Sequence, residues 1–157
     1  MCKVKIKYLS DKIGKEVNPP FYATEGSAGL DLSACCEEEI TLAPGERRGI
    51  PTGVAIQLPD GYGGFVFARS GLASRHGIAM SNGVGVIDSD YTGELICLLC
   101  NNSDEPYTIR CGDRIAQLVV LPVAHASLQV VEEFDPVSYT HLDVYKRQVY
   151  KRTFAVN

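Results

Sequence analysis

Two acids and a tyrosine stand in one glycine-punctuated segment, Gly83 to Glu94, between apolar runs typical of strands. Asp88 and Asp90 flank Ser89 where the chain leaves a strand, so their side chains diverge if the strand continues and converge if it turns. In either arrangement one carboxylate can face a cleft. Taken alone the pattern is weak, because acids near glycine also cap turns or lie in solvent.

Groups able to bind an anion occur in two other segments. Arg69-Ser70-Gly71 combines a planar guanidinium fork, a hydroxyl donor and a glycine that lets the backbone approach a ligand closely. Gln117 adds an amide donor. The formal net charge of -4 argues against a general nucleic-acid binder, whereas a small anionic substrate remains compatible with local positive charge from Arg69, Arg75, Arg110 and Arg114.

Six cysteines raise the question of a disulfide framework or a zinc site. Cys97 and Cys100 have a suggestive spacing, but they lie in a run that predicts a buried strand, where residues three apart point to opposite faces. We therefore interpret the cysteines as free buried thiols, with a metal site as the alternative. The histidines show no ligand spacing; they are His76, His125 and His141.

The elements that would position these residues are short strands. Turn signals recur at short intervals, and β-branched or aromatic runs lie between them at Val54–Leu58, Phe65–Phe67 and Ala116–Leu121. This pattern predicts an all-β sandwich of the jelly-roll kind with at most one short helix, at Ser70–His76. The runs Leu95–Cys100 and Leu118–Val123 indicate buried strands that are too short to span a membrane.

The first ten residues alternate lysines with apolar residues, which predicts a half-buried strand rather than a signal peptide. We therefore expect a cytoplasmic protein. At 157 residues and 45% hydrophobic content, the chain suits one domain, which we place at residues 1–135. Residues 136–157 are basic, lack glycine and contain Val-Tyr-Lys-Arg twice, so we interpret them as a non-native or disordered appendage; a partner-binding tail is the alternative.

Four segments, in this order and at these separations, resemble motifs of the trimeric deoxyuridine triphosphatases (dUTPases): Ala28–Leu32, Ala68–Ala73, Gly83–Glu94 and Gly112–Leu118. The resemblance covers roughly residues 3 to 135. It implies a distorted jelly roll, a homotrimer with sites between subunits, and Mg²⁺-dependent hydrolysis of dUTP to dUMP and pyrophosphate.

The resemblance also implies a role for each candidate residue. Asp88 matches the catalytic aspartate that deprotonates the water attacking the α-phosphate, with Asp90 structural. Tyr91 would lie flat against the deoxyribose and exclude a 2'-hydroxyl, although a core tyrosine is the alternative from position alone. The remaining positions are assigned by group: Asn82, Val86, Ile87 and Ile96 to the uracil pocket; Arg69, Ser70, Gly71 and Gln117 to the phosphates; and Asp31 to the metal, through water.

Asn82–Gly83 is expected to form a hairpin or tight turn. Arg114 is a candidate for an ion pair between subunits.

A fifth motif of the family, a glycine-rich arm, has no counterpart here because no glycine follows Gly112. Its loss is expected to lower turnover by orders of magnitude without preventing folding. Two alternative functions remain: a related dCTP deaminase, for which Glu94 is the nearby candidate glutamate, and a non-catalytic nucleotide-binding or regulatory protein.

Overall fold

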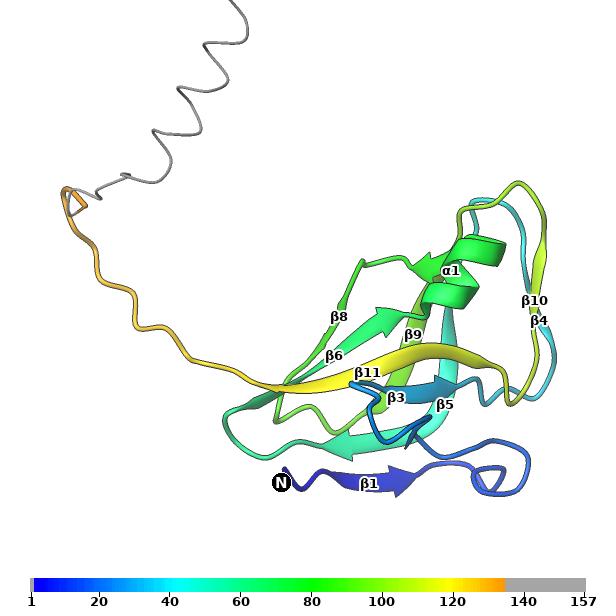
Figure 1. The fold of residues 1–157 in the computed structure, drawn as a ribbon, viewed down its shortest axis with the longest axis horizontal. Helices are drawn as coiled ribbons and strands as arrows, with labels where there is room; N and C mark the ends of the chain where they lie inside the picture. Colours follow the sequence, from blue (N-terminus) through cyan, green and yellow to red (C-terminus); the bar gives the residue numbers. More distant parts are fainter. Residues whose placement is uncertain (1, 135–157) are drawn as a thin grey trace, which may run out of the picture. The chain divides into compact units, whose positions relative to one another are not determined.

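The structure is a computed structural model that describes residues 2–134. Within these residues lie eleven strands and one short helix (Figure 1), in the order β1 Lys5–Tyr8, β2 Phe21–Tyr22, β3 Leu30–Ser33, β4 Ile40–Leu42, β5 Arg47–Gln57, β6 Tyr62–Ala68, α1 Ser70–His76, β7 Ile78–Met80, β8 Gly85–Ile87, β9 Glu94–Asn101, β10 Tyr107–Ile109 and β11 Arg114–Pro122. The all-β prediction and the single short helix are confirmed.

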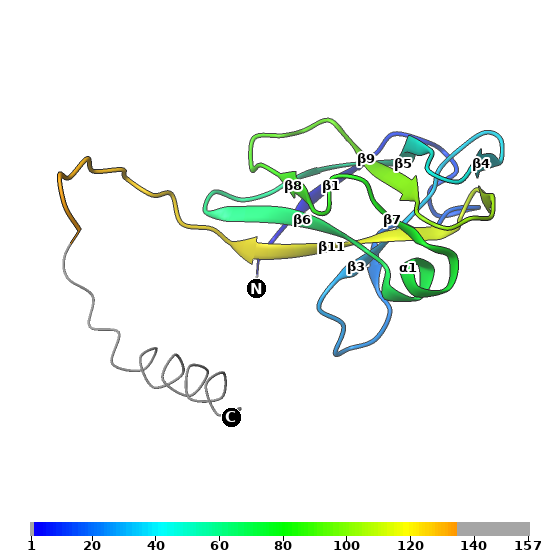
Figure 2. The same cartoon turned by 90° about the horizontal axis from the view of Figure 1, so that it is seen from above.

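The strands pair in antiparallel fashion into a four-stranded sheet, β1-β5-β9-β7, a five-stranded sheet, β2-β3-β11-β6-β8, and the two-stranded ribbon β10-β4. Figure 2 shows β6 and β11 side by side, with β5 and β9 in the other layer. The core between the layers takes side chains from both sheets, among them Leu32, Val54, Val66, Leu99 and Leu118.

Two expectations about burial are only partly right. The predicted strand near the N-terminus forms, but all four residues of β1 are exposed, because β1 lies at the edge of its sheet. The run Leu95–Cys100 is a strand whose core-facing residues are buried, while Ile96 is 52% and Leu98 44% exposed. Leu121, near the end of β11, is 44% exposed. Apolar composition identified the strands but overstated how much of each is covered.

Asn82 and Gly83 lie in a tight turn, and Gly83 has a φ of 72°. The strands on either side do not pair with each other, since β7 pairs with β9 and β8 with β6. The segment therefore crosses from one sheet to the other, so the tight turn is found and the hairpin is not. The chain between β7 and β8 therefore connects an edge strand of one sheet to an edge strand of the other.

The described residues divide into two units, one ending at His125 and the other beginning at Ala126. The described part of the second unit, residues 126–134, contains no helix or strand. The predicted boundary at residue 135 and the predictions about residues 136–157 lie outside the described residues and stay predictions. No helix within residues 2–134 is long and apolar enough to cross a membrane.

Candidate functional site

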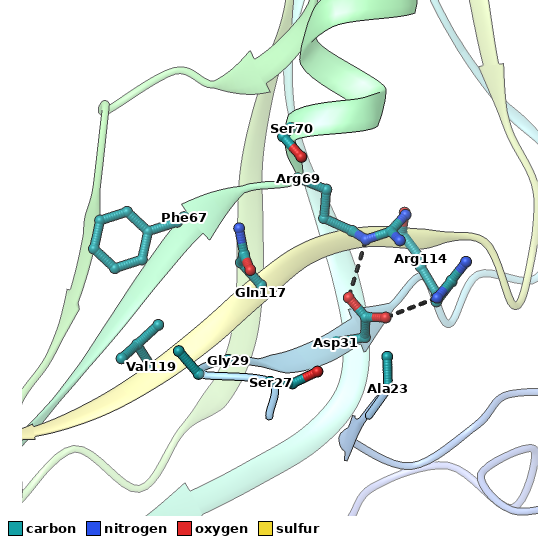
Figure 3. Close-up of a pocket in the computed structure, with 11 residues that line it drawn as sticks. Ala23, Ser27, Gly29, Asp31, Phe67, Arg69, Ser70, Arg114, Gln117 and Val119 are labelled. Atoms are coloured by element: carbon teal, nitrogen blue, oxygen red, sulfur yellow. Dashed lines mark hydrogen bonds and ion pairs between the residues drawn. The ribbon is translucent and has the colours of Figure 1, made fainter. Parts of the chain in front are cut away.

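A cavity of about 350 Å³ lies on the outer face of the five-stranded sheet (Figure 3). We call it the basic cavity. Asp31 on β3 and Phe67 on β6 both stand directly opposite Gln117 on the central strand β11, so their side chains share one face. The other lining residues are Ala23, Ser27, Ala28, Gly29, Arg69, Ser70, Arg114 and Val119.

The Asp31 carboxylate organises the charges of the basic cavity. Its Oδ1 accepts a hydrogen bond from Arg69 Nε at 3.0 Å, and its Oδ2 accepts one from Arg114 Nη1 at 2.9 Å. Arg69 Nη1 also donates to the Arg114 carbonyl oxygen at 3.1 Å. Two guanidinium groups against one carboxylate leave a positive charge in the cavity, which favours an anion.

Arg69 and Ser70 enter the cavity because β6 ends there and α1 begins. Arg69 is the N-cap residue in extended conformation, and its carbonyl oxygen accepts the first helical hydrogen bonds from Leu72 and Ala73. Gly71 follows inside the helix but does not line the cavity. A Cβ on Gly71 would meet no atom within 4 Å, so nothing in this chain requires a glycine there.

Gln117 is held by its own chain. Its Nε2 donates to the Ala68 carbonyl oxygen at 3.0 Å, which leaves the second N–H of the amide free to face a ligand. Gly29 provides the space for this side chain, because a Cβ there would lie 3.2 Å from Gln117 Oε1. The sequence analysis missed Gly29; a glycine next to a strand often marks a close approach of this kind.

A second cavity, of about 340 Å³, lies where the edges of the two sheets separate; we call it the Tyr91 cavity. It brings together Asp88, the candidate catalytic base, and the residues that the sequence assigned to the uracil and the deoxyribose, namely Asn82, Val86, Ile87, Tyr91 and Ile96. Glu94 lines it as well. Val86 is 63% and Ile96 52% exposed, so the apolar wall of this cavity is open to a ligand or a partner.

Asp88 and Tyr91 belong to one turn that follows β8. The Tyr91 N–H donates to the Asp88 carbonyl oxygen at 3.2 Å, and the Tyr91 hydroxyl donates to the Glu94 carbonyl oxygen at 2.8 Å. The tyrosine is therefore not a core residue: it is 44% exposed, with its hydroxyl anchored. Asp88 is exposed, and it also lines a neighbouring cavity of about 510 Å³ that contains Asp90 and His125.

The Glu94 side chain bonds to β5, the neighbouring strand of the same sheet. Its Oε1 accepts the Gly53 N–H at 2.8 Å, at an irregularity in the pairing of β5 with β9 between Pro51 and Ala55. Next to it, the Thr52 hydroxyl donates to the Leu95 carbonyl oxygen at 2.6 Å. Glu94 therefore stabilises the start of β9, which fixes the end of the Asp88–Tyr91 turn.

The lining residues described for the basic cavity and the Tyr91 cavity do not overlap. Val66 contributes to the Tyr91 cavity and Phe67 to the basic cavity. Successive residues of a strand point to opposite faces, so β6 separates the two cavities within one chain.

The profile of the dUTPase family matches residues 15–143. A deoxyuridine 5'-triphosphate nucleotidohydrolase of Idiomarina loihiensis is 49% identical over 135 residues, which are 85% of this chain and 89% of the relative. This chain belongs to the dUTPase family. The resemblance drawn from the four motifs is thereby confirmed.

Solved structures give the same result for the fold. A mutant dUTPase of Staphylococcus bacteriophage 80alpha with dUpNHpp matches with a TM-score of 0.75 and 30% identity, covering 87% of this chain and 92% of that one. A mutant dUTPase of phage phi11 of S. aureus, described as coordinating a structural Mg(II) ion, matches with a TM-score of 0.74 and 28% identity, covering 85% and 99%. The jelly-roll prediction is confirmed.

Proposed function

We propose that this chain hydrolyses dUTP to dUMP and pyrophosphate, with Asp88 activating the attacking water. The observation that carries the proposal is the Tyr91 cavity, where a carboxylate, an anchored tyrosine and an apolar wall from separate strands line one space. Hydrolysis of a phosphoanhydride needs a base within hydrogen-bond reach of a water in line with the leaving group. An exposed carboxylate at the rim of a nucleoside site meets that need.

Replacement of the base is the direct test. Asp88→Asn keeps the size of the side chain and removes its basicity, so dUTP binding is expected to stay near normal while pyrophosphate release stops. Substantial activity in this variant would remove the assignment of Asp88. Because the tail lies outside the described residues, the assay includes a chimera in which a glycine-rich family arm replaces residues after Asp135. Hydrolysis by neither protein would favour a non-catalytic nucleotide-binding role.

We further propose that the working enzyme is a homotrimer whose sites combine the Tyr91 cavity of one subunit with the basic cavity of another. The placement of the two cavities supports this arrangement, because a nucleotide cannot pass through the sheet that separates them. The apolar side chains left open on β8 and β9, Val86, Ile96 and Leu98, are available to the subunit contact.

Complementation between two inactive variants tests the shared site. Asp88→Asn damages only the Tyr91 cavity, and Arg69→Gln damages only the basic cavity. After joint refolding in equal amounts, about a quarter of the sites in a cyclic trimer combine two intact halves and recover activity. No recovery, with mixed trimers demonstrated by native mass spectrometry, would place both halves in one subunit.

Asp31 would help to hold Mg²⁺ by accepting hydrogen bonds from metal-bound water. Two of its roughly four lone-pair positions accept guanidinium hydrogen bonds, which leaves acceptor capacity for metal-bound water. Such indirect binding suits Mg²⁺, which gives up its hydration shell reluctantly and would neutralise negative charge on the phosphates here. The phi11 dUTPase, described as coordinating a structural Mg(II) ion, supports magnesium binding within the family. Arg69, Ser70 and Gln117 would hold the phosphates and neutralise the charge that develops on them.

The deaminase alternative is not favoured, because one oxygen of Glu94 already stabilises the β5–β9 pairing at Gly53. Ammonia release from dCTP is the measurement that would restore the deaminase alternative.

We place the activity in the cytoplasm. The free thiols of the six cysteines support this placement, since disulfides persist mainly in oxidising compartments.

A further inference from the structure

We propose that Gly93 is a positioning residue that sets the sugar selectivity of the site by letting the Tyr91 ring fold back against the backbone of residue 93. This inference rests on the proposed function. It concerns a residue that contributes no side chain to the Tyr91 cavity and that acts only through its neighbour.

The Tyr91 ring occupies the space where a side chain at position 93 would begin. A Cβ built on Gly93 would lie 2.7 Å from Tyr91 Oη, 2.8 Å from Cζ and 3.2 Å from Cε2. Real Cβ atoms essentially never make contacts below 3.0 Å, so the ring would have to move by roughly 0.7 Å or more to bring Oη to ordinary van der Waals distance. The close approach of ring to backbone thus depends on glycine.

The ring is the main obstacle to a side chain at this position. Gly93 is absent from the described glycines with positive φ, so an alanine there meets no left-handed backbone penalty. The three contacts nearest to its Cβ all belong to Tyr91. A substitution at Gly93 therefore acts first on Tyr91.

The Tyr91 ring cannot easily move away from residue 93 while its hydroxyl keeps its hydrogen bond. Its hydroxyl donates to the Glu94 carbonyl oxygen at 2.8 Å. Glu94 is itself held by the Gly53 N–H at 2.8 Å, and Leu95 by the Thr52 hydroxyl at 2.6 Å. An added methyl group consequently either breaks the anchor or swings the ring away from residue 93.

A displaced ring would change the wall that meets the sugar. If Tyr91 packs against the deoxyribose, movement of the ring makes room for a 2'-hydroxyl and weakens the contact with dUTP. Displacements approaching 1 Å cost catalysis up to about 100-fold, so Gly93→Ala is expected to lower the ratio of kcat/KM for dUTP over UTP by roughly 10- to 100-fold.

The experiment is a double-mutant cycle with Gly93→Ala, Tyr91→Ala and both together, measured on dUTP and on UTP. If Gly93 acts through Tyr91, the alanine at 93 changes the selectivity ratio in the wild-type background and adds nothing once the ring is gone. Gly26→Ala is the matched control, because a Cβ there meets nothing within 4 Å and Gly26 lines neither cavity. An unchanged ratio in Gly93→Ala, or an equal fall in the Tyr91→Ala background, overturns the inference.

A readout independent of catalysis separates this inference from the proposed function. In protein with ¹³C-labelled tyrosine, Gly93→Ala is expected to shift the ring resonances of Tyr91 while those of the other tyrosines stay in place; Tyr91→Phe assigns the signal. A wild-type protein that releases no pyrophosphate from dUTP would refute the function alone. An unmoved Tyr91 signal would refute the positioning role whatever the activity.

Discussion

Asp31→Asn removes the carboxylate that joins β3 to the start of α1 and the start of β11. The side chain of Asp31 is 11% exposed and accepts hydrogen bonds from Arg69 and Arg114 at 3.0 and 2.9 Å. Breaking a fully buried ion pair from one side costs about 3–5 kcal/mol, and a hydrogen bond to a charged group contributes about 1.5–3 kcal/mol. These two ranges frame the loss in the free energy of unfolding that is expected for Asp31→Asn.

The expected loss is smaller than the buried limit, because water reaches both partners. The Arg69 side chain is 26% exposed and that of Arg114 is 45% exposed. The asparagine carbonyl also keeps one acceptor. We therefore expect Asp31→Asn to lower the free energy of unfolding by about 1–3 kcal/mol.

Urea unfolding followed by circular dichroism measures this loss at one protein concentration and without nucleotide. Glu39→Gln is the matched control, because the Glu39–Arg110 pair has the same 2.9 Å separation while its side chains are 59% and 63% exposed. That pair is expected to contribute less than about 1 kcal/mol. An Asp31→Asn variant as stable as Glu39→Gln would refute the argument that burial makes the Asp31 pairs important.

Three further outcomes follow from local geometry. Gly53→Ala is expected to cost more than about 2 kcal/mol in thermal unfolding, because Gly53 has a φ of 68° and its Cβ would lie 2.7 Å from Cys35 Sγ; an unchanged midpoint would contradict this. The Ala43 N–H hydrogen bond, made at 2.9 Å, lowers the pKa of Glu46 below its usual value. Its stabilising effect is thus present above the unfolded-state pKa and lost as pH falls through the folded-state pKa, so the stability difference between wild type and Glu46→Gln should vanish in acid. Burial raises the pKa of Cys97 to about 12, so iodoacetamide at neutral pH should leave this thiol unmodified in native protein and modify it after unfolding, as read by peptide mass spectrometry.

Local pattern was sufficient to predict the strands and the helix, since alternation and turn residues are properties of a few neighbouring positions. Burial was harder to predict. The apolar residues of β1 and the outward residues Ile96 and Leu98 read as buried, although they are exposed in this chain. A sequence pattern reports that a side chain is apolar, and whether a second sheet or another subunit covers it depends on contacts that the local pattern does not contain.

In the candidate site too, local motifs were predictable from the sequence, whereas contacts between distant residues were not. The residues that the sequence assigned to the nucleoside line one cavity, and Arg69, Ser70 and Gln117 line the other; their roles stay predictions. The pairing of Asp31 with Arg114 was beyond its reach, because 83 positions separate the two residues and only strand register brings them together. The candidate ion pair of Arg114 between subunits stays a prediction; within the chain, Arg114 pairs with Asp31.

Strand β6 contributes consecutive residues to the two cavities. Val66 lines the Tyr91 cavity and Phe67 the basic cavity, and they are consecutive residues on one strand. If sites form between subunits, the two faces of β6 contribute to two different active sites of the trimer. A change that tilts β6 would then disturb both sites at once, while a change confined to α1 or to the Asp88–Tyr91 turn would disturb one half of a site and leave the other half intact.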